Sequence, residues 1–346
     1  MTRQDFTGPK IGINGFGRIG RLTLRAALEN PNVALNVMAI NDLMKPAEMA
    51  HLFKYDSTMR TFNGEVDHTD SSIIINGHAI QVIAERDPAN LPWAKLGVEV
   101  VMECTGLFTD ADKAKAHLTA GAKKVIISAP AKGEDITIAL GINADLYDPA
   151  KHHIISNASC TTNCLAPVAK VLHEQFGIVH GLMNTIHSYT GDQRLLDAPH
   201  SDLRRARSAA VNIVPTSTGA AKAISLVLPA LKGKLHGFAV RVPTPTVSMV
   251  DLTVTTEKPT SVDAINQAMK LACDNELKGI LAYSDLPLVS SDFIGNPHSS
   301  IFDPELTLVV GDHMAKIIAW YDNEWGYSNR LAELTQMVAT KLPVNA

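Results

Sequence analysis

The stretch of the chain with the most suggestive chemistry is SNASCTTNC, residues 156–164, in which two cysteines lie four residues apart among small hydroxyl and amide side chains. Such a pair could bind a metal ion, form a disulfide or contain a nucleophile. The spacing C-x-x-x-C is not the C-x-x-C of redox motifs, and no second cluster of cysteines and histidines completes a zinc set. A disulfide within one helical turn is geometrically awkward and is disfavoured in the cytosol. We therefore expect free thiols and no metal site.

The residues after this motif predict a helix that begins close to the first cysteine. The segment CLAPVAKVLHEQF (164–176) has a helical pattern, in which Pro167 is tolerable if it falls in the first turn. Asn157 or Ser159 could cap the helix. Cys160 would then lie at the positive end of the helix dipole, which lowers the pKa of a thiol. From the residues alone, Cys160 is either a reactive nucleophile or a buried structural cysteine.

Cys164, one turn further along, is expected to pack into the core. A cysteine nucleophile needs a base, and the chain offers thirteen histidines. His187, in MNTIHSYTGDQ (183–193), ends a strand-like run and precedes a polar loop, which is a common place for chemistry. The other reading of His187 is a surface or hydrogen-bonded histidine.

A glycine pattern near the N-terminus indicates a dinucleotide site. The segment NGFGRIGR (14–21) places Gly15, Gly17 and Gly20 in G-x-G-x-x-G spacing, after a strand-like run and before a helical one. The first glycine allows a tight turn, the second lets the backbone approach a pyrophosphate, and the third lets the helix pack on the strand. The N-terminus of the helix would face the phosphates.

An acidic residue, Asp42, ends the next predicted strand. A carboxylate there can accept hydrogen bonds from the ribose hydroxyls and would repel the 2′-phosphate of NADP. Leu43 follows it and no arginine is adjacent, although Lys45 is close. NAD is therefore the expected cofactor.

The rest of the chain indicates two domains, which suits its 346 residues. Between residues 10 and 150, short β-branched runs alternate with helical stretches, which favours a parallel sheet covered by helices. From about residue 178, longer alternating runs predict antiparallel strands. We expect a Rossmann dinucleotide-binding domain over 1–159 and an α+β catalytic domain with a largely antiparallel sheet over 160–322. A C-terminal helix, about 323–346, should pack back on the first domain.

Composition excludes several classes of protein. The net charge of −4 is spread without a long basic or acidic block, so nothing points to nucleic acid. No secretory signal and no membrane span are visible. Four unpatterned cysteines suit a reducing compartment. We expect a cytoplasmic globular protein.

Six motifs stand in an order and at separations typical of one enzyme family: INGFGRIGR, SNASCTTNC, HSYTGDQ, NIVPTSTGAAKA, VRVPTPTVS and WYDNEWGYS. Together they closely resemble the phosphorylating glyceraldehyde-3-phosphate dehydrogenases of the NAD-dependent, bacterial type, nearly end to end. The resemblance implies a homotetramer that converts D-glyceraldehyde 3-phosphate, NAD+ and inorganic phosphate to 1,3-bisphosphoglycerate, in glycolysis or gluconeogenesis.

The same resemblance implies roles for individual residues. Cys160 would add to the aldehyde to form a thiohemiacetal and then a thioester, with His187 as its base. Thr190 and Arg241 would bind the substrate phosphate. The inorganic phosphate site would be formed by Ser159, Thr161, Thr218, Gly219 and one arginine among Arg204, Arg205 and Arg207, of which Arg205 is favoured.

The cofactor contacts are implied in the same way. They would comprise Gly15, Gly17, Arg18, Ile19 and Gly20 at the pyrophosphate, Asp42 at the ribose, Arg86, Thr105 and Ser128 along the dinucleotide, and Asn323 at the nicotinamide amide. The loop 191–210 resembles a segment that reaches the cofactor site of a neighbouring subunit, and its Ala198-Pro199 pair resembles NAD-using members.

Two alternatives remain to be distinguished. An erythrose-4-phosphate dehydrogenase would share the fold and the cysteine, but that group tends to lose Thr190 and the STG of the phosphate site, residues 217–219, all present here. A nucleotide-binding or redox-sensing protein without catalysis would be suggested by loss of Cys160, His187 or Arg241, and none is lost.

Overall fold

A computed structural model of the chain describes residues 8–342. The fold consists of two compact units. The first unit contains residues up to 138, residues 145–158 and residues from 328 onward, and the second contains residues 139–144 and 159–327. Each unit is described by itself below.

The sheet of the first unit has nine strands among the described residues, in the order β3-β4-β5-β2-β1-β6-β7-β9-β8. All pairs from β5 to β8 are parallel, whereas β3, β4 and β5 pair antiparallel. The predicted parallel sheet is thus confirmed, and the antiparallel strands at one edge are an addition to it. The strands are β1 (Lys10–Asn14), β2 (Asn36–Asn41), β3 (Val66–His68), β4 (Ser72–Ile75), β5 (His78–Ile83), β6 (Val100–Glu103), β7 (Lys124–Ile127), β8 (Ile136–Thr137) and β9 (Ile154–Ser156).

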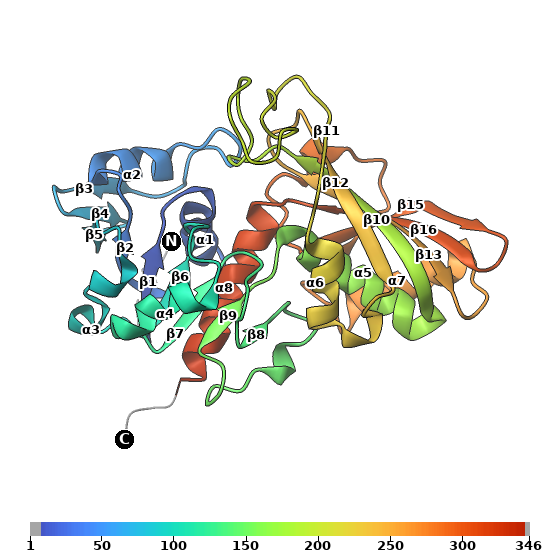
Figure 1. Cartoon of the computed structure of the whole chain (residues 1–346), viewed down its shortest axis with the longest axis horizontal. Coiled ribbons are helices and arrows are strands. Elements are labelled where there is room, and N and C mark those ends of the chain that lie inside the picture. The colour runs from blue at the N-terminus through green and yellow to red at the C-terminus, as the bar shows by residue number, and fades with distance from the viewer. Residues whose placement is uncertain (1–7, 343–346) are drawn as a thin grey trace. The chain divides into compact units, whose positions relative to one another are not determined.

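Helices connect these strands as crossovers (Figure 1). They are α1 (Arg18–Glu29), α2 (Pro46–Lys54), α3 (Trp93–Leu96) and α4 (Ala111–Thr119), with short 3-10 turns at Pro88–Asn90 and Ala144–Leu146. The last helix, α8 (Trp325–Thr340), returns to this unit for most of its length. The Gln336 side chain accepts from the backbone N–H of Ala34 at 2.5 Å and donates to the carbonyl of Asn32 at 2.8 Å, which fixes α8 against the connection between α1 and β2.

The sheet of the second unit has the order β11-β12-β10-β13-β16-β15-β14, and four of its six strand pairs are antiparallel. The neighbouring strands β10 and β12 pair in parallel, as do β14 and β15, and the register of β10 and β12 sets His187 beside Arg241. The strands are β10 (Ile178–Ser188), β11 (Val214–Thr216), β12 (Leu235–Val242), β13 (Ser248–Thr256), β14 (Leu281–Tyr283), β15 (Ser300–Val310) and β16 (Met314–Tyr321).

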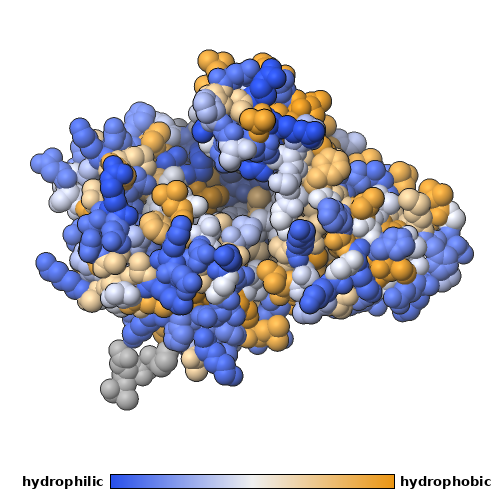
Figure 2. Space-filling model, viewed as in Figure 1, coloured by the Kyte–Doolittle hydropathy of each residue, from blue (hydrophilic) through white to orange (hydrophobic). Residues whose placement is uncertain are grey.

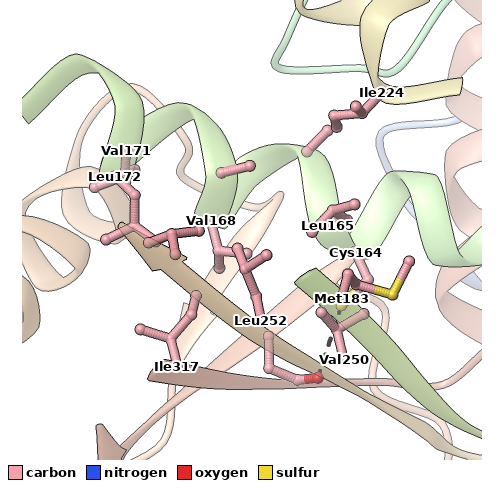
Figure 3. Packing of buried hydrophobic residues seen from close by; sticks show 14 of the residues in the cluster. Cys164, Leu165, Val168, Val171, Leu172, Met183, Ile224, Val250, Leu252 and Ile317 are labelled. Carbon is pink, nitrogen blue, oxygen red and sulfur yellow. Dashed lines mark hydrogen bonds between the residues drawn. The ribbon is translucent and has the colours of Figure 1, made fainter. Parts of the chain in front are cut away.

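Three helices cover one face of this sheet: α5 (Cys160–Phe176), α6 (Ala220–Val227) and α7 (Val262–Asp274) (Figure 1). Short 3-10 turns lie at Pro229–Leu231 and Ser290–Phe293. The apolar side of α5 meets the sheet through Cys164, Leu165 and Val168, opposite Val250 and Leu252 of β13 (Figure 3). Cys164 is fully buried there, as predicted.

One local prediction about α5 is wrong. Pro167 lies inside the helix and beyond its first turn. Proline has no N–H, so the carbonyl of Asn163 loses its helical donor at this point. The packed, buried surface of α5 outweighs this loss and keeps the helix continuous to Phe176. Among the described residues, no helix is both long and apolar enough to cross a bilayer.

Candidate active site

A cavity of about 370 Å³ opens in the first unit where β1, β2 and β6 end. The carboxyl ends of parallel strands are where α/β sheets bind nucleotides. Five of the predicted cofactor residues line it: Gly15, Gly17, Asp42, Arg86 and, on the segment after β6, Thr105. The cavity is also lined by residues that the sequence did not single out, namely Asn14, Asn41, Glu85, Cys104, Leu107 and Phe108, besides Leu43.

The glycine loop fits a pyrophosphate. Gly15 has φ 93°, a conformation that favours glycine. A side chain at Gly17 would meet only open space, so this position leaves room for a ligand to approach the backbone. A side chain at Gly20 would overlap the carbonyl oxygen of Gly15. The third glycine is therefore needed because helix α1 touches the loop itself, a closer constraint than the expected packing of helix on strand.

Asp42 holds this loop as well as facing the cavity. Its Oδ2 accepts from the backbone N–H of Phe16 at 2.6 Å, and its Oδ1 accepts from that of Met44 at 3.0 Å. A carboxylate fixed by two backbone donors presents its remaining lone pairs in one direction. This geometry suits a pair of ribose hydroxyls.

The other predicted cofactor residues of the first unit are not among those that line the cavity. Arg18, Ile19 and Gly20 form the first turn of α1, and Ser128 directly follows β7. The Arg18 guanidinium pairs with Asp56 and donates from Nη2 to the hydroxyl of Thr58 at 2.7 Å. Burial alone would raise the pKa of Asp56, but the N–H of Met59 and the charge of Arg18 lower that pKa to about 2.

A buried polar network lies behind the cavity wall, and sequence reasoning missed it. The indole N–H of Trp93 donates to His117 Nδ1 at 3.0 Å, so the proton of His117 resides on Nε2 and is donated to Glu103 at 3.0 Å. Glu103 also accepts from the amide of Asn14 at 2.6 Å and from the backbone N–H of Thr105 at 2.8 Å. The sequence does contain a sign of this network, because a polar residue ends each of two otherwise apolar strands: Asn14 on β1 and Glu103 on β6.

The second unit brings together the cysteine and the histidine predicted to react. Cys160 is the first residue of α5, whose N-cap is Ser159; the Ser159 hydroxyl accepts from the N–H of Thr162 at 3.0 Å. His187 lies near the end of β10. Cys160 Sγ and His187 Nε2 are 3.5 Å apart, within hydrogen-bond reach for sulfur.

The other ring nitrogen of His187 has two partners. His187 Nδ1 lies 2.7 Å from the carbonyl oxygen of Ser188 and 2.8 Å from Arg241 Nη1, which also donates to that carbonyl at 3.0 Å. In the tautomer with its proton on Nδ1, the ring donates to the carbonyl of Ser188 and Nε2 has a lone pair directed at the thiol; in the other tautomer, Nδ1 accepts from Arg241. In the first of these tautomers His187 can take the proton of Cys160.

The electrostatics of this pair correct one prediction. Burial raises the pKa of the Cys160 thiol, and the nearby charge of Arg241 only partly opposes this. The expected lowering by the helix dipole is therefore outweighed. Burial and then the Arg241 charge lower the pKa of His187 to about 3. Both groups are neutral near pH 7, which leaves a thiol facing an unprotonated base.

Among the three arginines of LRRAR, the structure distinguishes one. Arg205 donates from Nε to the hydroxyl of Thr216 at 2.9 Å and from Nη2 to the carbonyl of Ser217 at 3.2 Å, and its Nη1 binds Asp192 at 2.6 Å. Its charge also lowers the pKa of His187. Arg207 instead pairs with Asp197 and is 63% exposed. Arg204 is exposed and reaches only the carbonyl of Pro215, at 3.5 Å.

The remaining predicted phosphate ligands are spread over three segments of the same unit. Thr161 shares a hydrogen bond of 2.9 Å with the buried hydroxyl of Tyr321, so one side of its hydroxyl is already used. Thr218 and Gly219 form the start of α6, where Thr218 Oγ1 accepts from the N–H of Ala220 at 3.2 Å. Thr190 lies in the loop just after β10.

Two further groups in the second unit have unused hydrogen-bonding capacity. Among the described residues, nothing accepts from the buried Nε of Arg241. Asn323, just after β16, is 5% exposed, and its Oδ1 accepts from the hydroxyl of Ser248 at 2.9 Å. No group of three or more metal-ligating side chains occurs within residues 8–342.

Comparisons with known proteins agree over almost the whole chain. Two family models match it: the NAD binding domain of glyceraldehyde 3-phosphate dehydrogenase over residues 9–111, and the C-terminal domain of the same enzyme over residues 159–323. The glyceraldehyde-3-phosphate dehydrogenase of Geobacillus stearothermophilus is 59% identical over 332 residues, which are 96% of this chain and 98% of that protein. The corresponding proteins of Streptomyces coelicolor and Bacillus subtilis are 57% and 58% identical, each over 96% of this chain and 99% and 98% of their own length.

Proposed function

The chain belongs to the glyceraldehyde-3-phosphate dehydrogenase family, an NAD-dependent oxidoreductase family, and on that premise we propose that it converts D-glyceraldehyde 3-phosphate and inorganic phosphate to 1,3-bisphosphoglycerate. The observation that carries the proposal is the distance of 3.5 Å between Cys160 Sγ and His187 Nε2, beside Arg241. A nucleophile, its base and an anion-binding guanidinium are the groups that this reaction requires.

The reaction begins with proton transfer from the thiol of Cys160 to Nε2 of His187 as sulfur attacks the aldehyde carbon. The carbonyl oxygen becomes an oxyanion, which the backbone N–H of Cys160, at the start of α5, can stabilise. His187 then returns the proton to this oxyanion, which gives a thiohemiacetal on Cys160. Covalent attachment divides one difficult step into easier ones.

Bound NAD+ supplies the acceptor for the hydride that leaves the former aldehyde carbon. His187 takes the hydroxyl proton of the thiohemiacetal as that hydride leaves, and Cys160 then carries a thioester. An oxygen of inorganic phosphate attacks the thioester carbon and the carbon–sulfur bond breaks. The acyl phosphate is released, and the Cys160 sulfur recovers its proton from His187.

The reaction requires two anion-binding sites. Arg241 and Thr190 bind the phosphate of the substrate; the buried, unpaired Nε of Arg241 supports this assignment. Inorganic phosphate is bound by Ser159, Thr161, Thr218, Gly219 and Arg205. The contacts of Arg205 with Thr216 and Ser217 support its choice over Arg204 and Arg207.

The residues of the first unit fit the cofactor. The open space at Gly17 would admit the pyrophosphate, and the fixed carboxylate of Asp42 would bind the adenosine ribose. Gly15, Gly20, Arg18 and Ile19 shape the loop, and Arg86, Thr105 and Ser128 make further contacts along the dinucleotide. Asn323 of the second unit binds the carboxamide of the nicotinamide.

We also propose a homotetramer, because hydrophobic surface is exposed in two regions. The sheet face of the second unit that its helices leave uncovered carries Leu182, Phe238, Leu308, Val310 and Met314, each at least half exposed. The loop 191–213 exposes further large apolar side chains, and Figure 2 shows hydrophobic surface gathered on it at the top of the view. Burial of such patches between copies would stabilise a closed assembly.

We also propose that the protein resides in the cytoplasm, since its four cysteines are free thiols. The alternative substrate, erythrose 4-phosphate, is not favoured by the relatives. NADH formation from each aldehyde, with and without inorganic phosphate, tests the proposal. Fast turnover of the triose that depends on phosphate is expected, whereas turnover without phosphate that favours the tetrose would contradict it.

A further inference from the structure

Ser248, at the start of β13, links Ser188, the residue after the base His187, to the proposed cofactor ligand Asn323. Its hydroxyl oxygen accepts from the backbone N–H of Ser188 at 3.1 Å and lies 2.9 Å from Oδ1 of Asn323. All three side chains are buried, with Ser188 0% exposed, Ser248 1% and Asn323 5%. The family resemblance assigns no role to Ser248.

The link fixes which way the amide of Asn323 points. Because the Ser188 N–H already donates to Ser248, the proton of the Ser248 hydroxyl must find an acceptor, and Oδ1 of Asn323 is the one within reach. The NH2 group of Asn323 is then turned away from Ser248. Among residues 8–342, no hydrogen-bond acceptor is found for this NH2 group, which leaves it available to a ligand.

Through Ser188, Ser248 is also connected to the base His187. Ser188 directly follows His187, and its carbonyl oxygen lies 2.7 Å from His187 Nδ1 and accepts from Arg241 Nη1 at 3.0 Å. Its side chain is held too, because Ser188 Oγ donates to the carbonyl of Val247 at 2.7 Å. One hydroxyl, that of Ser248, thus joins Ser188, whose carbonyl oxygen contacts the base, to the amide of Asn323.

We propose that Ser248 is a positioning residue that turns the NH2 group of Asn323 toward the nicotinamide, so that Asn323 acts as a donor and selects the carbonyl oxygen of the carboxamide. The inference rests on the proposed function, in which Asn323 binds that carboxamide. A carboxamide has one acceptor end and one donor end, so a fixed donor allows only one rotation of the nicotinamide ring. A free Asn323 amide could flip and would accept either rotation.

The test compares ligands that differ only in the nicotinamide. NAD+ and ADP-ribose are titrated by calorimetry into the full-length wild type and into Ser248→Ala. Loss of one oriented hydrogen bond should weaken NAD+ binding by roughly fivefold to tenfold. Affinity for ADP-ribose should not change, because that ligand has no carboxamide. A third ligand, 3-acetylpyridine adenine dinucleotide, keeps the carbonyl and lacks the NH2 group, and it should lose affinity as NAD+ does.

Thr246→Val is the matched control. Thr246 is also buried, and its hydroxyl donates to Oδ1 of Asp322 at 2.9 Å, one residue before Asn323. This variant should bind all three ligands as the wild type does. Should Ser248→Ala fold poorly, Ser248→Cys keeps a similar volume with a weaker donor and should show a smaller loss of the same kind.

Each other outcome overturns the inference. Equal losses for NAD+ and ADP-ribose would mean that Ser248 only supports the local structure, and unchanged NAD+ binding would mean that Ser248 does not orient Asn323. If the wild type itself binds NAD+ no more tightly than ADP-ribose, the placement of Asn323 at the nicotinamide fails. Failure of the proposed reaction would appear separately, as turnover that does not need phosphate.

Discussion

His187 Nε2 lies 3.5 Å from Cys160 Sγ, while the other nitrogen of the same ring lies 2.7 Å from the carbonyl oxygen of Ser188 and 2.8 Å from Arg241 Nη1. The base is therefore oriented before any substrate arrives. Both groups are neutral near pH 7 because they are buried. Proton transfer can then accompany the attack on the aldehyde.

Arg241 should set the pH at which the thiol becomes reactive. Its charge lowers the pKa of Cys160 against the opposing effect of burial, so Arg241→Gln should raise that pKa. Since the thiolate is the form that reacts with iodoacetamide, the midpoint of the alkylation rate should move to higher pH. The rate is followed from pH 5 to 10, with Arg207→Gln as the control because Arg207 is solvent-exposed. A midpoint that stays in place, or moves to lower pH, would show that Arg241 does not act on the thiol.

Arg205 and Arg207 provide a matched pair for the inorganic phosphate site. Arg205→Ala removes a guanidinium that contacts Thr216 and Ser217, and a charge-assisted hydrogen bond contributes about 1.5–3 kcal/mol. The KM for phosphate should therefore rise by roughly tenfold to a hundredfold, with little change in the KM for NAD+. Arg207→Ala should leave both constants unaltered. Equal effects of the two substitutions would contradict the assignment of Arg205.

Two glycines of the nucleotide loop should respond differently to alanine. Gly17 has φ −70°, which alanine adopts freely, and its surroundings are open. Gly17→Ala should therefore keep the thermal stability of the wild type and weaken NAD+ binding by about tenfold, because the methyl group occupies the space for the pyrophosphate. Gly20→Ala should lower stability as well, since its methyl group would overlap the carbonyl of Gly15. Scanning calorimetry and NAD+ titration check both; unchanged affinity in Gly17→Ala would place the pyrophosphate elsewhere.

Asp42 should control the choice between NAD and NADP. Asp42→Ala removes the charge that repels a 2′-phosphate, so the ratio of the two dissociation constants should move toward one. It also removes the acceptor for the N–H groups of Phe16 and Met44, which should lower affinity for both cofactors. Asp42→Asn separates the two effects, because it removes the charge and keeps one acceptor. A preference that is unchanged in both variants would show that Asp42 does not lie at the ribose.

The sequence predicted those features that depend on neighbouring residues. The glycine loop, the parallel sheet of the first unit and the cap of α5 by Ser159 follow from short segments whose local chemistry is decisive. The juxtaposition of His187 and Arg241 could not be derived in this way, because it arises from the pairing of β10 with β12, strands that are far apart along the chain.

Burial explains the remaining differences. The helix dipole was expected to lower the pKa of Cys160, but a dipole acts locally whereas desolvation depends on every segment packed around the sulfur. The same holds for the Trp93–His117–Glu103 network, whose members come from three separate elements. Helix α5 tolerates Pro167 in its interior because tertiary packing compensates for the hydrogen bond that the carbonyl of Asn163 loses.

The central claim is that phosphate releases a product attached to Cys160, and single-turnover kinetics test it most directly. Mixing the enzyme with D-glyceraldehyde 3-phosphate and NAD+ in the absence of phosphate should give a burst of about one NADH per subunit. Mass spectrometry should find the acyl group on the peptide that contains Cys160, and adding phosphate should remove it and restart turnover. Cys160→Ser should show no burst while still binding NAD+. Steady turnover without phosphate, or an acyl group on another residue, would contradict the account.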